Sequence, residues 1–285
     1  MSVFFTDTDC ELWWTDVEDL GINIIKMPYT IDGEEHFYDM GKETDFDKFY
    51  SRIKQGAMPI TSALNPQDYI DYFEPVFQKG EDVFYVHFSD NLSGTFKHMQ
   101  VAINELKEKY PERKVITFNT KSICVGAGMS VYYAAKMHKE GKSDEEILKF
   151  LESFAPKVAT YFVVDSLAHL RRGGRISALS ATMGSLLNIK PILRVSADGK
   201  IEKYSTGKGM RKALHSMVEL MKEKFEPGYP VYILDAVNKE SADYVEEEIK
   251  QNFANVEIKR LPIGPVIGTH CGPGTVGIIF YAKER

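Results

Sequence analysis

Residues 83–118 read VFYVHFSDNLSGTFKHMQVAINELKEKYPERKVITF. The run at 83–88 is rich in Val, Phe and Tyr, which is typical of a strand. Residues 96–110 follow with helical period, and residues 115–118 return to β-branched and aromatic side chains. A strand, a helix and a second strand in this order predict a βαβ unit with parallel strands.

The same alternation extends along the chain in both directions and predicts an α/β fold. Two helices have clear start signals: Asn65 with Pro66 opens one to about residue 77, and a capping box from Ser143 to Glu146 opens one to about residue 154. Further strands are expected at 3–6, 21–27, 160–164, 192–195, 201–204, 231–234, 256–260 and 276–281.

The dipeptide Asp198-Gly199 separates two of these strands and predicts an antiparallel hairpin with a type I′ turn. This hairpin interrupts the succession of parallel βαβ units, so we expect a domain change near residue 160. Residues 1–160 would form an α/β domain with a mostly parallel sheet and flanking helices, and residues 161–285 an α/β domain with a mixed sheet. No linker rich in Ser, Pro or Gly separates the halves, so they are expected to abut.

Composition excludes several classes of protein. The 285 residues hold 35 Lys and Arg against 41 Asp and Glu, a net charge of −6, which disfavours a nucleic-acid binder. The three cysteines share no metal-ligand spacing and fit a reduced compartment. Neither a signal peptide nor a stretch of about 20 apolar residues is found, so a cytoplasmic protein without an integral membrane segment is expected.

Hydroxyl side chains follow two regions of the predicted sheet. Thr61 and Ser62 precede the helix that Asn65 begins, and Ser93, Gly94 and Thr95 follow the strand at 83–88. Ligands of α/β sheets bind at the carboxyl ends of strands, where helix N-termini attract anions. Capping of backbone groups is the alternative use of these hydroxyls. Two such segments together predict a shared carboxylate or phosphate.

A histidine lies in the segment 267–277, whose Gly and Pro content predicts a tightly shaped loop. His270 could donate to an anion or simply bond to backbone. The spacing of Gly272, Gly274 and Gly277 resembles a dinucleotide fingerprint, but it precedes a strand instead of opening a helix, so a nucleotide site is not expected. Cys271 adjoins His270, but adjacent side chains of an extended chain point apart.

Charged residues gather at two further places. Arg171, Arg172 and Arg175 surround a Gly pair at which a short helix is expected to end, and guanidinium groups suit carboxylate or phosphate capture. Asp7 and Asp9 follow the first strand and are expected to be solvated. The chain has no nucleophile elbow, Walker A loop or HExxH motif, so no catalytic residue, metal or cofactor is predicted.

Several of these motifs occur in a fixed order over nearly the whole chain, and together they resemble the DegV family of fatty-acid-binding proteins. They are Thr-Asp-Thr-Asp at 6–9, Ile-Thr-Ser at 60–62, Leu-Ser-Gly-Thr at 92–95, Gly-Gly-Arg-Ile at 173–176, Lys-Pro-Ile-Leu at 190–193, Asp-Gly-Lys-Ile at 198–201, and His270 before Gly-Pro-Gly at 272–274.

The resemblance implies two α/β domains with a buried tunnel for a long-chain fatty acid between them. It assigns the carboxylate to Thr61 and Ser93, with Ser62 and the Gly94 backbone as neighbours and His270 completing the polar network. It also implies a non-catalytic acyl carrier that presents the acid to a separate fatty acid kinase related to dihydroxyacetone kinases. Four further residues would support the site or dock that partner: Thr95, Arg171, Arg172 and Arg175.

This chain departs from the family at two places. Ala63-Leu64-Asn65 stands where Gln and Pro-Ser are common, and Cys271 replaces a small hydroxyl or aliphatic residue. Head-group geometry is therefore left open. Two other functions compete with the carrier: a regulatory module that senses lipid, and an acyl hydrolase with Ser93 as nucleophile and His270 as base.

Overall fold

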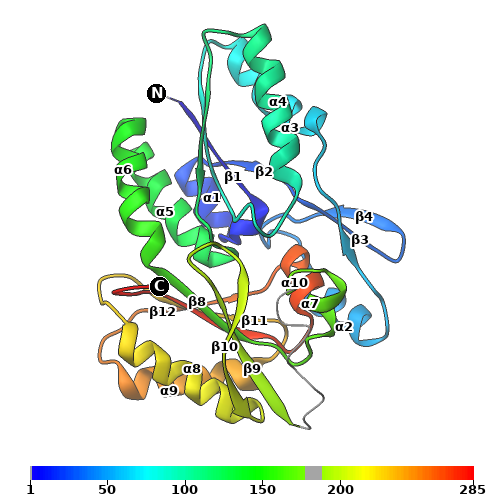
Figure 1. Ribbon diagram of the computed structural model, residues 1–285, viewed down its shortest axis with the longest axis vertical. Helices are drawn as coiled ribbons and strands as arrows, with labels where there is room; N and C mark the ends of the chain where they lie inside the picture. The colour runs from blue at the N-terminus through cyan, green and yellow to red at the C-terminus, as the bar shows by residue number, and fades with distance from the viewer. Residues whose placement is uncertain (1, 177–187) are drawn as a thin grey trace.

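The computed structural model describes residues 2–176 and 188–285, which form the expected α/β fold (Figure 1). The first sheet is parallel, in the order β2-β1-β6-β7. Its strands are β1 (Val3–Asp7), β2 (Asn23–Ile25), β6 (Val83–His87) and β7 (Val115–Asn119).

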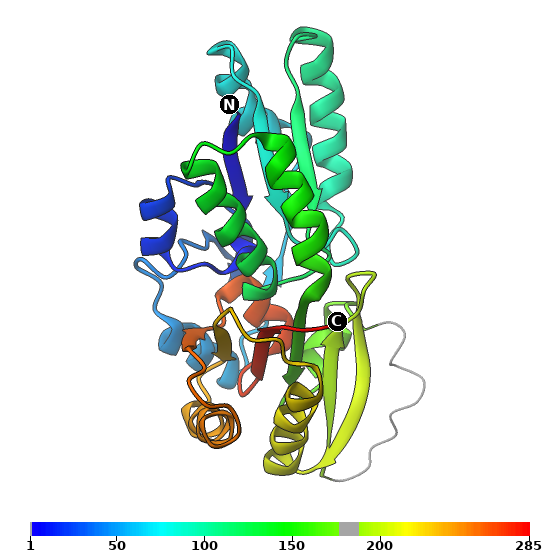
Figure 2. The same ribbon diagram turned by 90° about the vertical axis from the view of Figure 1, so that its left-hand side faces the viewer.

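Helices cover both faces of this sheet (Figure 2). Along β1, Phe5 meets Phe73 of α3 on one face, while Phe4 meets His138 of α5 on the other. This alternation follows from the period of two in a strand. The helices of this half are α1 (Trp14–Leu20), α2 (Phe46–Lys54), α3 (Pro66–Gln78), α4 (Thr95–Lys109), α5 (Val125–Lys139) and α6 (Asp144–Phe154), with 3₁₀ turns η1 (Thr8–Cys10) and η2 (Ala155–Lys157).

Both predicted helix starts are confirmed. Asn65 and Asp68 form a reciprocal capping box at α3, and Ser143 and Glu146 form one at α6. In each box the side chains bond the free N–H groups of the first turn, which is why these positions begin helices.

The second sheet is mixed, with the order β10-β9-β8-β13-β11-β12. Only the pair β11–β12 is parallel within it. Its strands are β8 (Val158–Val163), β9 (Ile189–Val195), β10 (Ile201–Lys208), β11 (Val231–Asp235), β12 (Ile258–Pro262) and β13 (Val276–Tyr281). Helices α8 (Met210–Lys224) and α9 (Lys239–Asn252) pack on one face, and the short helices α7 (Ala168–Arg172) and α10 (Pro265–Cys271) complete this half.

The hairpin β9–β10 is antiparallel as predicted, but its turn is not type I′. The φ angle is positive at Gly199 (77°) and not at Asp198. The Gly199 N–H donates to the Ser196 carbonyl (2.8 Å), and the Ser196 N–H donates to the Lys200 carbonyl (2.8 Å). An additional loop residue, Ala197, therefore makes a three-residue loop that ends in a left-handed glycine.

A small antiparallel sheet was not predicted. It has the order β4-β3-β5, with β3 (Pro28–Ile31), β4 (Glu34–Phe37) and β5 (Ile60–Thr61). The type I′ turn lies here, at Asp32 (φ 51°) and Gly33 (φ 83°). Consequently the strand expected over 21–27 ends at Ile25, and the chain turns into this sheet.

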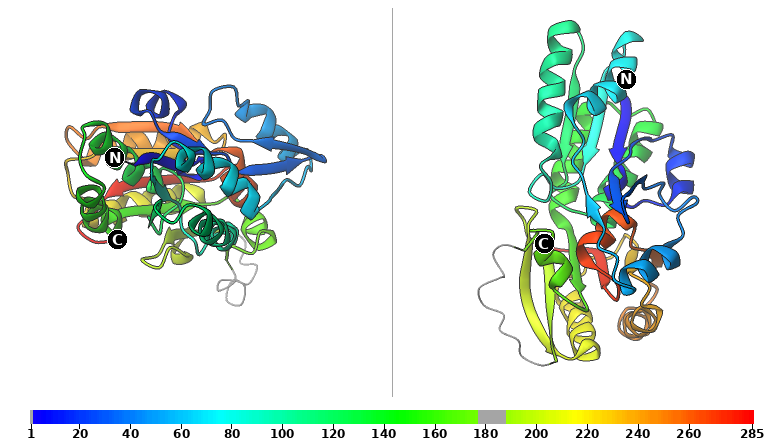
Figure 3. Two further views of the ribbon diagram at one scale, coloured as in Figure 1. Left: turned by 90° about the horizontal axis from the view of Figure 1, so that it is seen from above. Right: turned by 90° about the vertical axis from the view of Figure 1, so that its right-hand side faces the viewer.

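The two large sheets share a core where they approach each other. Phe49 and Tyr50 of α2 pack in one cluster with Leu193, Leu234 and Ile279 of the second sheet. Helix α10 lies in this middle layer (Figure 3). The chain passes from the first large sheet to the second at β8, so the halves abut instead of being joined by a free linker. No helix in the described ranges is long and apolar enough to cross a bilayer.

Candidate functional site

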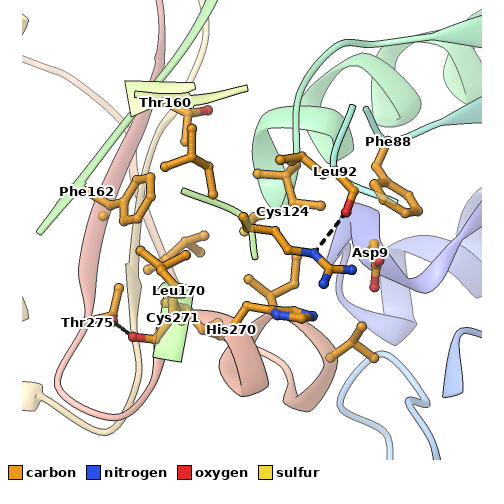
Figure 4. A pocket seen from close by; sticks show the side chains of 18 of the residues that line it. Asp9, Phe88, Leu92, Cys124, Thr160, Phe162, Leu170, His270, Cys271 and Thr275 are labelled. Carbon is orange, nitrogen blue, oxygen red and sulfur yellow. Dashed lines mark hydrogen bonds between the residues drawn. The ribbon is translucent and has the colours of Figure 1, made fainter. Parts of the chain in front are cut away.

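A cavity lies between the carboxyl ends of the parallel strands and the second sheet (Figure 4). Its polar side chains come from η1, β5 and the loops of the first half, from α10, from the segment after α7, and from Thr160 and Thr275 of the second half. Its apolar wall includes Phe88, Leu92, Phe162, Leu170, Ile201, Leu234, Ile263, Val266 and Ile279. An apolar cavity with polar groups gathered at a few positions suits an amphiphilic ligand.

Two predicted site residues, Thr61 and His270, are in contact. Thr61 Oγ1 lies 2.8 Å from His270 Nε2, and both residues line the cavity. Strand β5 holds Thr61 through its pairing with Tyr29. His270 occupies the last turn of α10, so the expected loop is wrong at this point. Gly264 and Pro265 begin that helix in the usual way.

His270 is uncharged near neutral pH. Burial, together with the nearby guanidiniums of Arg175 and Arg172, lowers the pKa of the imidazole to about 4. Its Nδ1 has no hydrogen-bond partner among the described residues. The neutral ring carries one proton, so it can donate from one nitrogen and accept at the other.

Ser62 and Ser93 also line the cavity. Ser62 is exposed, whereas Ser93 is half-buried and its Oγ accepts the Thr95 N–H (3.3 Å). Gly94 is the exposed N-cap of α4 and is not part of the cavity wall. Its φ of −75° is open to any residue, and nothing lies within 4 Å of the position a Cβ would take.

Thr95 lies behind these hydroxyl loops and is fully buried. Its Oγ1 accepts the Leu64 N–H (3.2 Å) and bonds the Tyr69 hydroxyl (2.9 Å). This side chain therefore ties the segment that follows Thr61 to the beginning of α4, which brings the two hydroxyl segments together.

The three arginines separate into two groups. Arg175 lines the cavity and donates from Nε to the Leu92 carbonyl (3.1 Å) and from a terminal nitrogen to the Gly173 carbonyl. Arg171 and Arg172 are exposed on α7, where Arg172 lies 3.2 Å from His169 Nδ1. Only Arg175 of the three reaches the cavity.

Three buried acids were not predicted as a site, and the expectation that Asp7 and Asp9 are solvated is wrong. Asp7, Asp9 and Glu11 are 0%, 6% and 2% exposed, and Asp9 lines the cavity. Burial raises the pKa of Asp7 to about 7 and that of Glu11 to about 8. Burial, with Asp7 and Glu11 nearby, raises the pKa of Asp9 as well. The spacing of acids two apart after a buried strand was the available signal.

The geometry does not favour covalent catalysis. Burial raises the pKa of the Cys271 thiol to about 12, so it is not a ready nucleophile. His270 Nε2 is directed to Thr61, and the Ser93 hydroxyl accepts a backbone N–H. No cluster of metal-ligating side chains occurs within residues 2–176 and 188–285.

Comparison with known proteins identifies a family that matches nearly the whole chain. The family model described as "Uncharacterised protein, DegV family COG1307" matches residues 3–283. A DegV domain-containing protein of Clostridium perfringens is 38% identical over 99% of this chain and 98% of its own length.

Solved structures share the fold over the full length. The crystal structure of DegV, a fatty acid binding protein from Bacillus subtilis, is 30% identical with a TM-score of 0.85 and 99% of each chain covered. A DegV family protein from Thermus thermophilus, described as binding fatty acid, is 26% identical with a TM-score of 0.86, covering 99% of this chain and 100% of its own.

Proposed function

Because this chain belongs to the DegV family, we propose that it binds one long-chain fatty acid in the cavity between its two large sheets. The carboxylate lies at Thr61, Ser93 and His270, with Ser62 beside it. The observation that carries this proposal is the contact of Thr61 with His270 at the polar part of an apolar cavity. Fatty acid binding by the relatives from Bacillus subtilis and Thermus thermophilus supports it.

The acyl chain provides most of the affinity. A chain of sixteen carbons buries about 15 of them at roughly 0.8 kcal/mol each, a gross gain near 12 kcal/mol before the costs of association. Charge-assisted hydrogen bonds to the carboxylate add about 1.5–3 kcal/mol each and fix which way the ligand enters.

The Thr61–His270 pair suits this task. If Nε2 carries the single imidazole proton, it donates to Thr61 Oγ1, and the Thr61 hydroxyl proton is then free for the carboxylate. A neutral ring orients the hydroxyl without becoming part of an ion pair. The Ser93 hydroxyl has a proton of its own to donate while its oxygen accepts the Thr95 N–H.

We further propose that the bound acid is presented to a separate fatty acid kinase of the dihydroxyacetone-kinase type, and that this chain itself has no catalytic role. The exposed Arg171 and Arg172 suit docking of that partner, while Arg175 belongs to the cavity.

Organic extraction followed by mass spectrometry, with native mass spectrometry of the intact protein, tests the ligand. One fatty acid per chain is expected, and its length and unsaturation identify the preference of the cavity. A protein that is empty and also fails to take up palmitate or oleate would overturn the proposal. Phosphorylation of the bound acid by a purified kinase of this type tests the carrier role separately.

A further inference from the structure

The carboxyl group of Asp9 lines the cavity with one oxygen unpaired. The residue is 6% exposed, and its Oδ1 has no hydrogen-bond partner within the described parts of the chain. Its backbone is held in place, because the Asp9 N–H donates to Asp7 Oδ1 (3.0 Å). Figure 4 places Asp9 on the side of Phe88, across the cavity from Phe162 and Thr275.

Acidic groups outnumber cations around Asp9. From its own segment it faces the acids Asp7 and Glu11, and the cation that acts on it is Arg175. The other titratable groups of the surrounding elements are Tyr69 of α3, Tyr85 of β6, Cys124 before α5 and His270 of α10. His270 is neutral, so Arg175 is the cation among the described residues that lines the cavity and can balance these acids and an anionic ligand together.

A fatty acid carboxylate in this cavity would meet a second carboxyl group. Two ionised carboxylates in one poorly solvated site repel, so such a pair holds one proton between them. A protonated carboxyl also has a donor, which an ionised one lacks. The Asp9 carboxyl group at the cavity wall would then have a partner in the ligand, as buried polar groups generally do.

We propose that Asp9 remains protonated and donates a hydrogen bond to the carboxylate of the bound fatty acid, so that the two carboxyl groups share one proton beside Arg175. This inference rests on the proposed function. Its direct consequence is that affinity falls as the pH rises through the ionisation of Asp9 in the empty protein, because binding must then take up a proton. The raised pKa of Asp9 is consistent with this behaviour. The limiting slope is a tenfold loss of affinity per pH unit.

The test compares the dissociation constant of palmitate, kept below its aggregation concentration, between pH 6 and 9.5 for the wild type and Asp9→Asn. The amide keeps the shape and a donor but cannot titrate. We expect the wild-type affinity to fall at least tenfold more than that of the Asn variant over this range, because Asp7 and Glu11 titrate in both proteins. Both proteins meet the same ligand, so ionisation of free palmitate cancels in the comparison.

Three further measurements complete the test. Asp90→Asn, which neutralises an exposed acid of the loop after β6, should leave the wild-type slope unchanged. Calorimetry at pH 8.5 in buffers of different ionisation enthalpy should show more proton uptake on binding by the wild type than by Asp9→Asn. Asp9→Ala should bind palmitate at least fivefold more weakly at pH 6.

Parallel pH profiles of wild type and Asp9→Asn, with equal proton uptake by both, would overturn the inference. Failure of the wild type to bind palmitate at every pH would instead overturn the proposed function, so the two failures are distinguishable. Should Asp9→Ala fail to fold, the comparison with Asp9→Asn still decides.

Discussion

Thr61 and His270 are 209 positions apart in the chain, and their side chains meet at 2.8 Å between Oγ1 and Nε2. The first belongs to the small sheet of the N-terminal half, and the second to a helix that follows β12 of the second sheet. Helix α10 contacts β3, β5 and α2, which fixes the two side chains relative to each other. The polar end of the cavity is therefore built by both halves jointly.

Removing the Thr61 hydroxyl should disturb the head group more than lipid uptake. Burial of the chain dominates affinity, so Thr61→Ala and Ser93→Ala are expected to carry close to one fatty acid per chain on extraction. Phosphorylation of the bound acid by a competent kinase should fall at least tenfold, because about 1.5–3 kcal/mol of orienting interaction is lost. Thr61→Ser keeps the hydroxyl and should stay within about threefold of wild type. Unchanged phosphoryl transfer with both alanine variants would remove these residues from the site.

Much of the fold was predictable because local signals agreed with the tertiary structure. The capping boxes at Asn65 and Ser143 and the strand at Val276–Tyr281 are examples. The small sheet was missed because β4 contains Glu34, Glu35 and His36, which have low strand propensity. Pairing with β3 and not propensity maintains that strand.

The part of the site in which hydroxyls follow strands could be predicted. The part whose conformation depends on tertiary packing could not. Helix α10 is rich in Val, Ile, Thr and Gly, all weak helix formers, and depends on its contacts with α2 and the small sheet. The burial of Asp9 depends on α5, which passes so close that a Cβ on Gly128 would lie 2.3 Å from the Cys10 carbonyl oxygen. No local sequence pattern predicts such a close contact between two segments.

Replacing Thr95 by Val should destabilise the protein and displace the hydroxyl segments. The change leaves the buried Leu64 N–H without its acceptor and removes the partner of the Tyr69 hydroxyl. We expect a loss of about 1–3 kcal/mol in the free energy of unfolding, measured by denaturant titration, together with weaker kinase-coupled turnover. Thr95→Ser retains the acceptor and should lose less than half as much. Equal stability of the Val and Ser variants would show that these hydrogen bonds contribute little.

Glu11 should make the protein less stable as the pH rises. Burial raises the pKa of this carboxyl from 4.5 to about 8 in the folded state. Below pH 4.5 both states are protonated and folding carries no penalty; between pH 4.5 and 8 the unfolded chain ionises first, so stability is lost until the folded pKa is reached. Glu11→Gln retains an oxygen for the Gly264 N–H and cannot titrate. The Gln variant should match wild type near pH 4.5 and exceed it by more than about 1 kcal/mol at pH 8. A difference that does not change with pH would contradict this account.

Gly268 should tolerate no side chain, because α10 rests directly on α2 there. A Cβ at Gly268 would lie 2.4 Å from the Tyr50 hydroxyl oxygen and 2.9 Å from its ring carbon. Tyr50 is fully buried and donates to the Ile263 carbonyl (2.8 Å), so it cannot move without losing that bond. Gly268→Ala is therefore expected to lower the free energy of unfolding by about 1–3 kcal/mol and to weaken head-group binding by shifting His270. Gly94→Ala, where the Cβ meets open space, should change stability by less than about 0.5 kcal/mol. Both are measured by denaturant titration, and a Gly268→Ala variant as stable as Gly94→Ala would mean that α10 is free to move away from α2.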